Sequence, residues 1–495
     1  MDFPEKAQSK SHSEAQDMKW IQPVQIPMPR DPAEARRWEH TRLRRRMLDG
    51  EWKQDLIDKI QEHIGTTRRE AWGALDLSSN QYRVICRALS CLYDRTPRVF
   101  HADESALPLT GRKGLIEQSG LWQQQQRFQS WVIGMRECLY RIDVDASGVL
   151  NYRPVFPDMV HAVANPDRPD EPIKICELRP RHRDGKTIWT YDELDISDEY
   201  NPTYKVYAAK GYYEGTAVDL SEEFLGGDMS GYNYPYRKKD STPILPYQMY
   251  HADRLGDRLF DPYEMIEIVD GSMNLAVAYS MWFHVLKDAS WPQRYIANGR
   301  VAGLGVAGDD SYRSEIVTDP ATVLMLEALE EGNQIMVGQW QSGGDVSKLI
   351  DALQEYGARL AQDAGLNPTD IQRVSGNARS GYAISLTNSG KREQQLKLKP
   401  VFSFADEQLM ARTAIMLNAM TGSSYPEDGY EVVYRQTELS QAEKKSHRED
   451  VFERLDRGFI SMAQAKAELE PGLTIKQAAS EITRIAALRR GLERG

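Results

Sequence analysis

Residues 261–290, with the sequence DPYEMIEIVDGSMNLAVAYSMWFHVLKDAS, constrain the fold more than any other segment of the chain. The opening Asp-Pro pair favours a helix start, and at 1.5 Å per residue a helix over residues 261–289 would be ~43 Å long. Because a helix that is apolar on most faces has to be surrounded, the segment predicts either a buried core helix or a helix packed between copies of the chain. The only clear polar line along it consists of Glu264, Glu267, Asp270 and Asn274.

A small β insert and a second helix follow. Residues 290–344 contain short strand patterns joined by glycine-rich turns, which is typical of β hairpins. Residues 345–365 form a helical pattern with Asp345 as the predicted N-cap and Gly365 just past its end. Leu349 lies in the apolar stripe of this helix, so we expect it to be on the packed face.

A loop interrupts the helical pattern before it resumes. The stretch RVSGNARSGYAIS, residues 373–385, holds two glycines, two arginines and small polar residues. The helical pattern resumes at Ser380 and continues to about Met420, and a strand pattern, YEVVYRQT, comes next. The chain then closes with three helical segments, SQAEKKSHREDVFERLDRG, SMAQAKAELE and TIKQAASEITRIAALRRGLER.

The first half of the chain changes from helix to strand. Residues 1–30 are predicted to be a flexible arm, and Asp31 with Pro32 marks the start of a helical region. Residues 115–142 are predicted to form one long amphipathic helix, and residues 140–255 are mainly antiparallel strands with a hairpin at Asp184-Gly185. The order of these patterns predicts an α+β fold that is mainly helical.

Composition limits the class of protein. Of 495 residues 41% are hydrophobic, enough for a core, and the net charge of −11 does not fit a chain with an overall basic DNA-binding face. The four cysteines form no CxxC pair, so we expect reduced core thiols. The N-terminal residues lack an apolar segment, and the longest apolar-rich run is shorter than the ~20 residues of a membrane span, so we expect neither a signal peptide nor membrane insertion.

Motifs for catalysis are weak. The sequence GLGVAG, Gly303–Gly308, matches G-x-G-x-x-G, but a polar stretch follows it where a dinucleotide-binding helix should begin. The sequence HADE, residues 101–104, has too few possible ligands nearby for a metal site. No G-x-S-x-G or P-loop motif is present. We therefore expect no enzyme activity, no catalytic residue, no cofactor and no metal.

One local cluster of positive charge stands out against the acidic total. Lys391, Arg392, Lys397 and Lys399 accompany a single acid, Glu393. Basic side chains at helical spacing can contact DNA phosphates, and they can equally form a solvated helix face or pair with acids of a neighbour. The sequence leaves two interpretations open: contact with DNA phosphates, or a helix face that is solvated or paired with acids of a neighbour.

The joint order of these elements resembles the portal proteins of tailed bacteriophages, the head-to-tail connectors. The stretch SGNARSGYAISL, residues 375–386, is similar to the family's pattern at the junction between its helices. Further similar stretches are RRRMLDGEW, TPILPYQMYH and VFERLDRGFISMAQAKAEL, and the resemblance covers roughly residues 35–485.

The resemblance implies a ring-forming architecture with long stem helices, a β-rich wing and clip, and a helical crown. The implied domains are a flexible arm (1–30), the wing (31–260 and 380–436), two stem helices (261–289 and 345–365), the clip (290–344), the tunnel loop (366–379) and the crown (437–495).

The resemblance also implies sites and partners. The channel or tunnel loop would present Arg373, Ser375, Gly376, Asn377, Arg379 and Ser380. The clip would dock other proteins through Gln293, Arg294, Tyr295, Glu327, Glu330 and Glu331. The implied partners are further copies in a dodecameric ring, the terminase large subunit, the head–tail adaptor, the major capsid protein and scaffold, and double-stranded DNA.

The implied function is the channel at the unique portal vertex of the virion, assembled in the host cytoplasm, through which DNA is packaged and ejected. Twelve acidic copies would hold DNA weakly, which suits a channel through which DNA slides. Two alternatives remain: an NAD(P)-dependent soluble enzyme that uses Gly303–Gly308, and another structural protein of the virion head–tail region.

Overall fold

The chain has an α+β fold. The computed structural model describes residues 29, 31–65, 78–111, 113–145, 147–253, 256–261, 266–290, 293–297, 299–301, 326–328, 334, 336–340, 346–366, 381–435, 441–470, 473 and 475–492. About half of the chain is helical, and several antiparallel sheets accompany the helices. The described residues fall into two compact units, one within residues 1–50, 85–264 and 372–495 and the other within residues 51–84 and 265–371.

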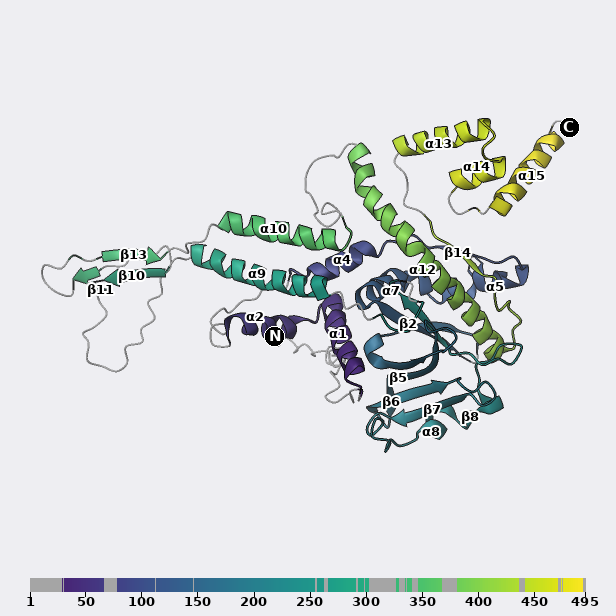
Figure 1. The fold of residues 1–495 in the computed structure, drawn as a ribbon, viewed down its shortest axis with the longest axis horizontal. Helices are drawn as coiled ribbons and strands as arrows, with labels where there is room; N and C mark the ends of the chain where they lie inside the picture. The colour runs from purple at the N-terminus through teal and green to yellow at the C-terminus, as the bar shows by residue number, and fades with distance from the viewer. Residues whose placement is uncertain are drawn as a thin grey trace, which may run out of the picture. The chain divides into compact units, whose positions relative to one another are not determined.

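Helices open the first unit (Figure 1). α1 (Pro32–Asp49) begins at Asp31, whose Oδ1 accepts a hydrogen bond from the backbone N–H of Ala33 at 3.0 Å. The start predicted from the Asp-Pro pair is therefore confirmed. The helices that follow are α4 (Gln81–Leu89), which contains residues of both units, η1 (Glu104–Ala106), α5 (Leu107–Thr110), α6 (Leu115–Gln118) and α7 (Leu121–Met135).

Antiparallel sheets form the centre of this unit. A three-stranded sheet has the order β3 (Leu150–Val155), β2 (Glu137–Val144), β9 (Tyr247–His251). A five-stranded sheet contains, in order, β4 (Val160–Ala164), β5 (Pro172–Arg183), β6 (Lys186–Asp195), β7 (Thr203–Ala208) and β8 (Met229–Ser230). Apolar residues of both sheets share one core, which includes Leu139, Ile175, Leu194, Val206 and Met249. The unit also contains η2 (Pro157–Met159), α8 (Ser221–Leu225), η3 (Gly231–Asn233) and the strand pair β1 (Arg98–Phe100) with β14 (Glu431–Val433).

The structure corrects one predicted helix and confirms one predicted turn. The helix expected over residues 115–142 is wrong, because α7 ends at Met135 and β2 begins at Glu137. β2 lies between β3 and β9, and this pairing on both sides overrides the local helical pattern. The hairpin at Asp184-Gly185 is confirmed: both residues have positive φ and join β5 to β6, as a two-residue hairpin turn requires.

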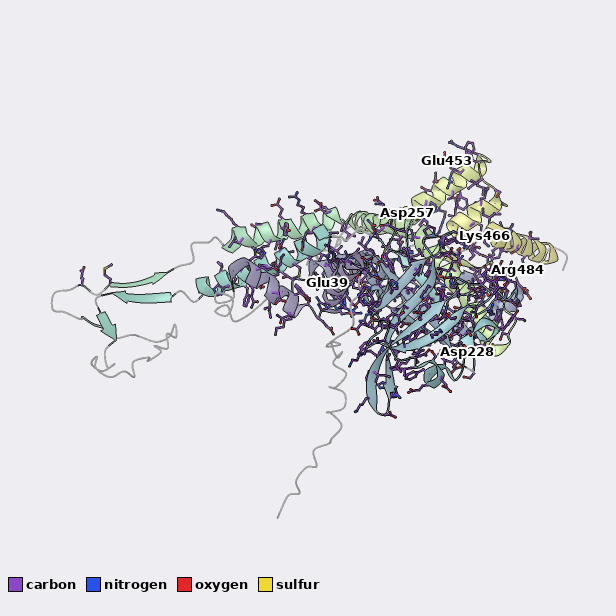
Figure 2. All side chains as sticks on the ribbon, turned by 60° about the horizontal axis from the view of Figure 1, so that its bottom comes forward. Glu39, Asp228, Asp257, Glu453, Lys466 and Arg484 are labelled. Atoms are coloured by element: carbon purple, nitrogen blue, oxygen red, sulfur yellow. The ribbon has the colours of Figure 1, made fainter. Side chains whose placement is uncertain are left out.

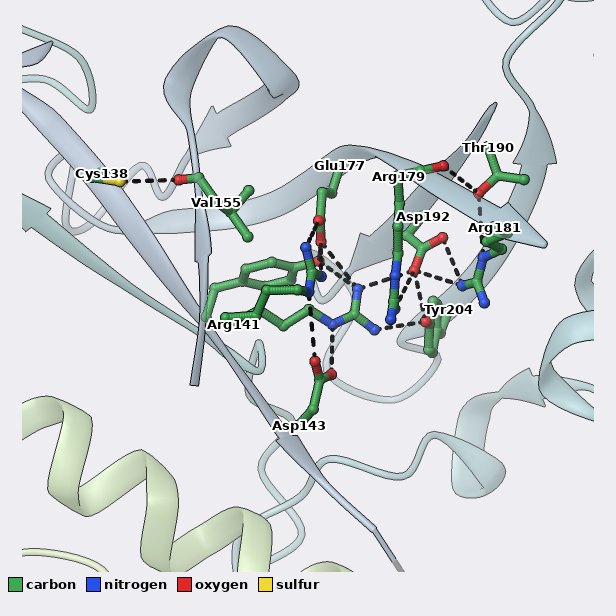
Figure 3. Close-up of polar contacts among 12 residues, drawn as sticks. Cys138, Arg141, Asp143, Val155, Glu177, Arg179, Arg181, Thr190, Asp192 and Tyr204 are labelled. Atoms are coloured by element: carbon green, nitrogen blue, oxygen red, sulfur yellow. Dashed lines mark hydrogen bonds and ion pairs between the residues drawn. The ribbon is translucent and has the colours of Figure 1, made fainter. Parts of the chain in front are cut away.

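A buried arginine connects the two larger sheets. Arg141 of β2 is 2% exposed, and its Nη1 donates to Glu177 Oε2 at 3.2 Å and to Asp192 Oδ2 at 3.0 Å. Glu177 lies on β5 and Asp192 on β6, so one guanidinium of the three-stranded sheet reaches two strands of the five-stranded sheet. Figure 3 shows these carboxylates together with Asp143 and Tyr204 around Arg141.

Neighbouring arginines complete this network. Burial acts to raise the pKa of Glu177, but Arg153 and Arg141 outweigh it and lower that pKa to about 2. Arg181 donates to both carboxylate oxygens of Asp192 at 2.8 Å. The buried carboxylates are therefore paired with cations, which is the condition under which charges are tolerated inside a protein.

A second buried carboxylate holds the longest helix in place. α12 (Gly381–Thr421) packs against β9, β2 and β14, and its Asp406 is fully buried. Asp406 Oδ1 accepts hydrogen bonds from Tyr250 Oη at 2.7 Å and Gln125 Nε2 at 3.2 Å. Its Oδ2 accepts from Tyr93 Oη at 2.9 Å and Tyr434 Oη at 2.5 Å. The four donors come from four separate segments of the first unit.

Burial raises the pKa of Asp406 to about 6, although the four hydrogen bonds oppose the shift. The stability that protonated Asp406 contributes is fully present at pH values below the pKa of this carboxyl in the unfolded chain. It is lost as the pH rises through about 6, the pKa in the folded chain. A shift of this size corresponds to about 3 kcal/mol.

We predict that Asp406→Asn lowers the free energy of unfolding, because an amide replaces one acceptor oxygen with a donor facing two other donors. The loss should be greater at pH 4.5 than at pH 7.5, since only the wild type gains stability on protonation. Urea denaturation at the two pH values measures both effects. Asp456→Asn, at an exposed position, is the control; a loss for Asp406→Asn that does not change with pH contradicts the assigned pKa shift.

The second unit contains an antiparallel helix pair. α9 (Ile266–Ser290) packs against α10 (Val346–Asp363) and against α2 (Lys53–Ile64). Between α9 and α10 lie the strand pair β10 (Gln293–Ala297) with β13 (Met336–Trp340) and the pair β11 (Gly299–Val301) with β12 (Leu326–Ala328). The chain thus runs along α9, forms the four strands, and runs back along α10 in the opposite direction.

Two glycines allow α9 and α10 to approach closely. A Cβ atom added at Gly271 of α9 would lie 2.4 Å from Leu360 Cδ2, and one at Gly357 of α10 would lie 3.5 Å from Leu275 Cδ2. Gly357 O also accepts a hydrogen bond from Gln81 Nε2 at 3.4 Å. Because the pairs 271–360 and 275–357 run in opposite directions, the two helices are antiparallel along this contact.

We predict that Gly271→Leu destabilises the helix pair by about 1–3 kcal/mol, because the added side chain overpacks the site occupied by buried Leu360. Thermal unfolding followed by circular dichroism measures the loss. Gly256→Leu is the matched control, since no atom lies within 4 Å of a Cβ built there. Equal melting temperatures for the two variants contradict the close approach.

Three helices follow β14: α13 (Gln441–Asp456), α14 (Met462–Leu469) and α15 (Ile475–Leu492). Ser461 and Gln464 form a capping box at the start of α14, with the Ser461 hydroxyl accepting from the Gln464 N–H at 3.2 Å. No helix in the described parts of the chain is both long and apolar enough to cross a bilayer.

Candidate functional site

The α9–α10 pair and the strands between its ends form the candidate site. α9 ends at Ser290 and β10 begins at Gln293, while β13 ends at Trp340 and α10 begins at Val346. The β10–β13 pair therefore lies next to the end of α9 and the start of α10 in the chain. In its register, Gln293 lies opposite Trp340 and Ala297 opposite Met336.

Burial differs between the two halves of α9. In the first half Ile268, Met273, Leu275 and Val277 are each 5% exposed or less. In the second half Phe283 is 44% exposed, and Trp282 and Leu286 are half-buried. Packing within one chain thus accounts for the apolar character of the first half, and leaves the second half partly open to solvent.

α10 also carries exposed apolar side chains. Leu349 is 40% exposed and Tyr356 is 36% exposed. Continuing the antiparallel register of α9 and α10 puts Leu349 at the level of Phe283, near the strands. We call Phe283, Leu349 and Tyr356 the stem patch. Apolar surface of this kind is stabilised by contact with another protein surface.

Sequence patterns did not predict the exposure of all residues in the stem patch. Leu349 was expected on the packed face of its helix, but it is 40% exposed, although it lies three helical turns from Leu360 on the face that meets α9. Tyr356 had no distinguishing pattern in the sequence. The apolar nature of residues 279–286 was visible, but which of these side chains α2 and α10 cover depends on the tertiary structure.

The predicted clip residues lie on different strands. Gln293, Arg294 and Tyr295 belong to β10, and Glu327 belongs to β12, where it is opposite Arg300. Glu330 and Glu331 lie outside the described residues. The strand positions bring the first three residues together, and their docking role stays a prediction.

The predicted channel residues cannot be placed in the structure. Arg373, Ser375, Gly376, Asn377, Arg379 and Ser380 lie outside the described residues, in the segment between α10 and α12. Gly303–Gly308 also lies outside the described residues.

The basic cluster lies on the N-terminal half of α12. The backbone of Lys391 and Arg392 is helical, and their side chains lie outside the described set. Lys397 Nζ lies 3.2 Å from Glu393 Oε1, and Lys397 and Lys399 are both exposed. The i,i+4 pair offsets the charge of Lys397, which favours the solvated-face interpretation for that residue.

The HADE motif has structural contacts. His101 Nε2 lies 2.8 Å from the carbonyl oxygen of Asp428, beside the β1–β14 pair. Asp103 Oδ1 accepts a hydrogen bond from Ser105 N–H at 2.8 Å and caps η1. These contacts hold the loop against the segment that precedes β14.

No protein-family model and no curated protein matches the chain. Among solved structures, it is similar to the neck of an empty GTA (gene transfer agent) particle computed with C6 symmetry, with a TM-score of 0.41 and 13% sequence identity over 79% of this chain and 90% of that chain. It is also similar to the neck of a native GTA particle computed with C12 symmetry, with a TM-score of 0.39 and 13% identity over 80% of this chain and 89% of that chain. TM-scores this low do not establish a shared fold.

We predict that the double substitution Phe283→Ser/Leu349→Ser leaves the free energy of unfolding of the monomer within about 1 kcal/mol of the wild type, because both side chains are substantially exposed. It should abolish or strongly weaken self-association, since the apolar surface is lost. Analytical ultracentrifugation over a concentration series measures this. Unchanged self-association contradicts a role for the stem patch.

Proposed function

We propose that this chain is a phage portal protein, which forms a ring at the capsid vertex through which double-stranded DNA is packaged and ejected. The observation that carries the proposal is the order α9, strands, α10, a connecting segment, α12, β14 and three terminal helices. This order, together with the stretch SGNARSGYAISL, is what resembles the portal family.

The helix pair supports assembly into a ring. A cyclic ring needs surfaces that each subunit can present to the next one. Phe283 and Leu349 of the stem patch supply apolar surface near the β10–β13 strands, and packing within one chain leaves them partly open. In the proposed ring, neighbouring subunits cover this patch, and the ring contains twelve copies.

The charge balance supports passage of DNA through the ring. Phosphate binding strengthens with the number of cations presented, so a ring of subunits that each carry −11 would hold DNA weakly. Residues 366–379 are proposed as the tunnel loop, and local rings of Arg373 and Arg379 would then contact passing phosphates. The strand segment 290–344 is proposed as the clip that docks the terminase and later the head–tail adaptor.

Negative-stain electron microscopy of the purified protein tests the proposal directly. We expect rings with a central channel. Monomers alone at every salt and protein concentration would overturn it. Ordered assemblies without a channel would instead favour another structural protein of the head–tail region.

We predict that Arg373→Ala/Arg379→Ala leaves ring assembly intact and reduces packaging or retention of DNA, because the substitutions remove cations from the proposed channel. Particles complemented with each variant are assayed for DNA protected from nuclease. The control is Arg168→Ala/Arg183→Ala, two exposed arginines of the sheet region. Normal DNA content in the first variant contradicts the assigned role of the loop.

A further inference from the structure

One arginine holds both ends of the chain segment that follows β9 and precedes α9. We call the described part of residues 252–261 the connector. Arg136 lies between the end of α7 and the start of β2. Its carbonyl oxygen accepts a hydrogen bond from Ala252 N–H at 2.7 Å, and its guanidinium donates to Asp253. The same guanidinium donates through Nε to Asp261 Oδ2 at 2.8 Å, so a single residue restrains the connector at its start and at its end.

Arg136 adopts a backbone conformation that favours glycine. Its φ is +74°, in the left-handed region, where the Cβ atom of an L residue is crowded by its own backbone. A glycine at this helix end would avoid the cost of that crowding. The guanidinium and the carboxylate of Asp261 are both mostly buried, so water screens their attraction little. The side-chain bonds to the connector thus offset a backbone strain that a glycine would not have.

The middle of the connector is exposed, and the residues just before its end are packed. Leu259 is buried in the core that the two larger sheets share, and Phe260 packs against that core. The Cζ atom of Arg37 lies 3.8 Å from the centre of the Phe260 ring. Asp257, labelled in Figure 2, is exposed, as is Arg258 beside it. The connector is therefore attached at discrete points rather than along its whole length.

The residue after Arg136 binds the same end of the connector. Glu137 is the first residue of β2 and is 2% exposed. Its Oε2 accepts a hydrogen bond from the backbone N–H of Asp261 at 3.3 Å. Asp261 thus contacts two successive residues, Arg136 through its side chain and Glu137 through its backbone. A buried carboxylate in this place makes the attachment sensitive to its charge.

Several charged or titratable groups surround Glu137. Those that face it are Arg37 and Arg44 of α1, Asp261 of the connector, and His251, which lies opposite it in the β2–β9 register. Asp158 of η2, which packs against β2, is paired with Arg45 at 3.0 Å. Burial is the largest influence and raises the pKa of Glu137 to about 7; Asp261 acts in the same direction, and the two arginines of α1 oppose it.

The charge state of Glu137 is therefore linked to opening of the connector. Burial lowers the pKa of His251 below its usual value, so its ring is neutral where Glu137 titrates. Ionised Glu137 places a second negative charge beside Asp261 in a site with little water. When the connector opens, water reaches Glu137 and its pKa falls towards the usual value. The connector is thus held most firmly at low pH and loses this stability as the pH rises through about 7.

We propose that Arg136 and Glu137 form a latch that holds the connector against the sheet, and that ionisation of Glu137 loosens it. The latch belongs to the single chain, so it does not depend on the proposed ring. Because α9 begins at Ile266, the latch restrains the segment that leads into this helix.

Hydrogen exchange of the full-length protein at pH 5.5 and pH 8 tests the role of Glu137. Protection of the Ala252 and Asp261 amides, corrected for the intrinsic exchange rate at each pH, should fall by about tenfold or more at the higher pH, because opening releases a proton at the lower one. Glu137→Gln accepts the same hydrogen bond and cannot ionise, so its protection should be equal at both pH values. Glu199→Gln, at an exposed position, is the control and should behave as the wild type.

Three results overturn the proposed role of Glu137. The first is wild-type protection that does not change with pH. The second is an equal change in Glu137→Gln. The third is a fall of the same size in the amides of β6, which assigns the effect to unfolding of the whole unit rather than to the connector.

The variant Arg136→Gly tests the arginine separately. Glycine relieves the backbone strain and removes the bonds to both aspartates, so the circular dichroism spectrum should be unchanged while protection of the Asp261 amide falls about tenfold or more. Lys113→Gly is the matched control, because Lys113 has a φ of +69° and lies outside the connector. Arg136→Lys keeps the charge without the fork that reaches two carboxylates, and should give an intermediate value. Wild-type protection in either Arg136 variant overturns the latch.

Discussion

The hydrogen bonds to Asp406 are the interaction on which the arrangement of the first unit depends. One fully buried carboxylate on α12 accepts from Tyr93, Gln125, Tyr250 and Tyr434, which come from four separate segments. Leaving any of these buried donors without a partner costs free energy, so the helix can neither slide nor rotate without losing several bonds together. The four donors thereby hold α12, whose N-terminal end follows the proposed tunnel loop.

The Arg141 network does the same for the sheets. Its guanidinium binds Glu177 and Asp192 of the five-stranded sheet while belonging to the three-stranded one. Apolar packing is non-directional, whereas these charged hydrogen bonds fix the position of β2 relative to β5 and β6 of the other sheet. The first unit is thus a platform held by buried polar contacts in its interior.

Exposed apolar side chains are found elsewhere, at the stem patch and at Phe452, Phe459 and Met462 of the terminal helices and the turn between them. Both lie on helices whose single-chain packing is incomplete. Surfaces of this kind are common where subunits meet, since burial of the same side chains stabilises an assembly without stabilising the monomer. In the proposed ring, contact between subunits would cover apolar surface of this kind.

Local sequence patterns determined much of the element order. The Asp31-Pro32 helix start and the Asp184-Gly185 turn depend on backbone geometry within a few residues, so the sequence alone predicts them correctly. The boundary between α7 and β2 could not be predicted, because strands distant in sequence pair with Glu137–Val144 on both sides. The partners of Asp406 and Arg141 and the exposure of Leu349 were also decided by the tertiary structure. In each of these cases the deciding contact joins residues far apart in the chain, and no local pattern encodes which distant side chains will meet.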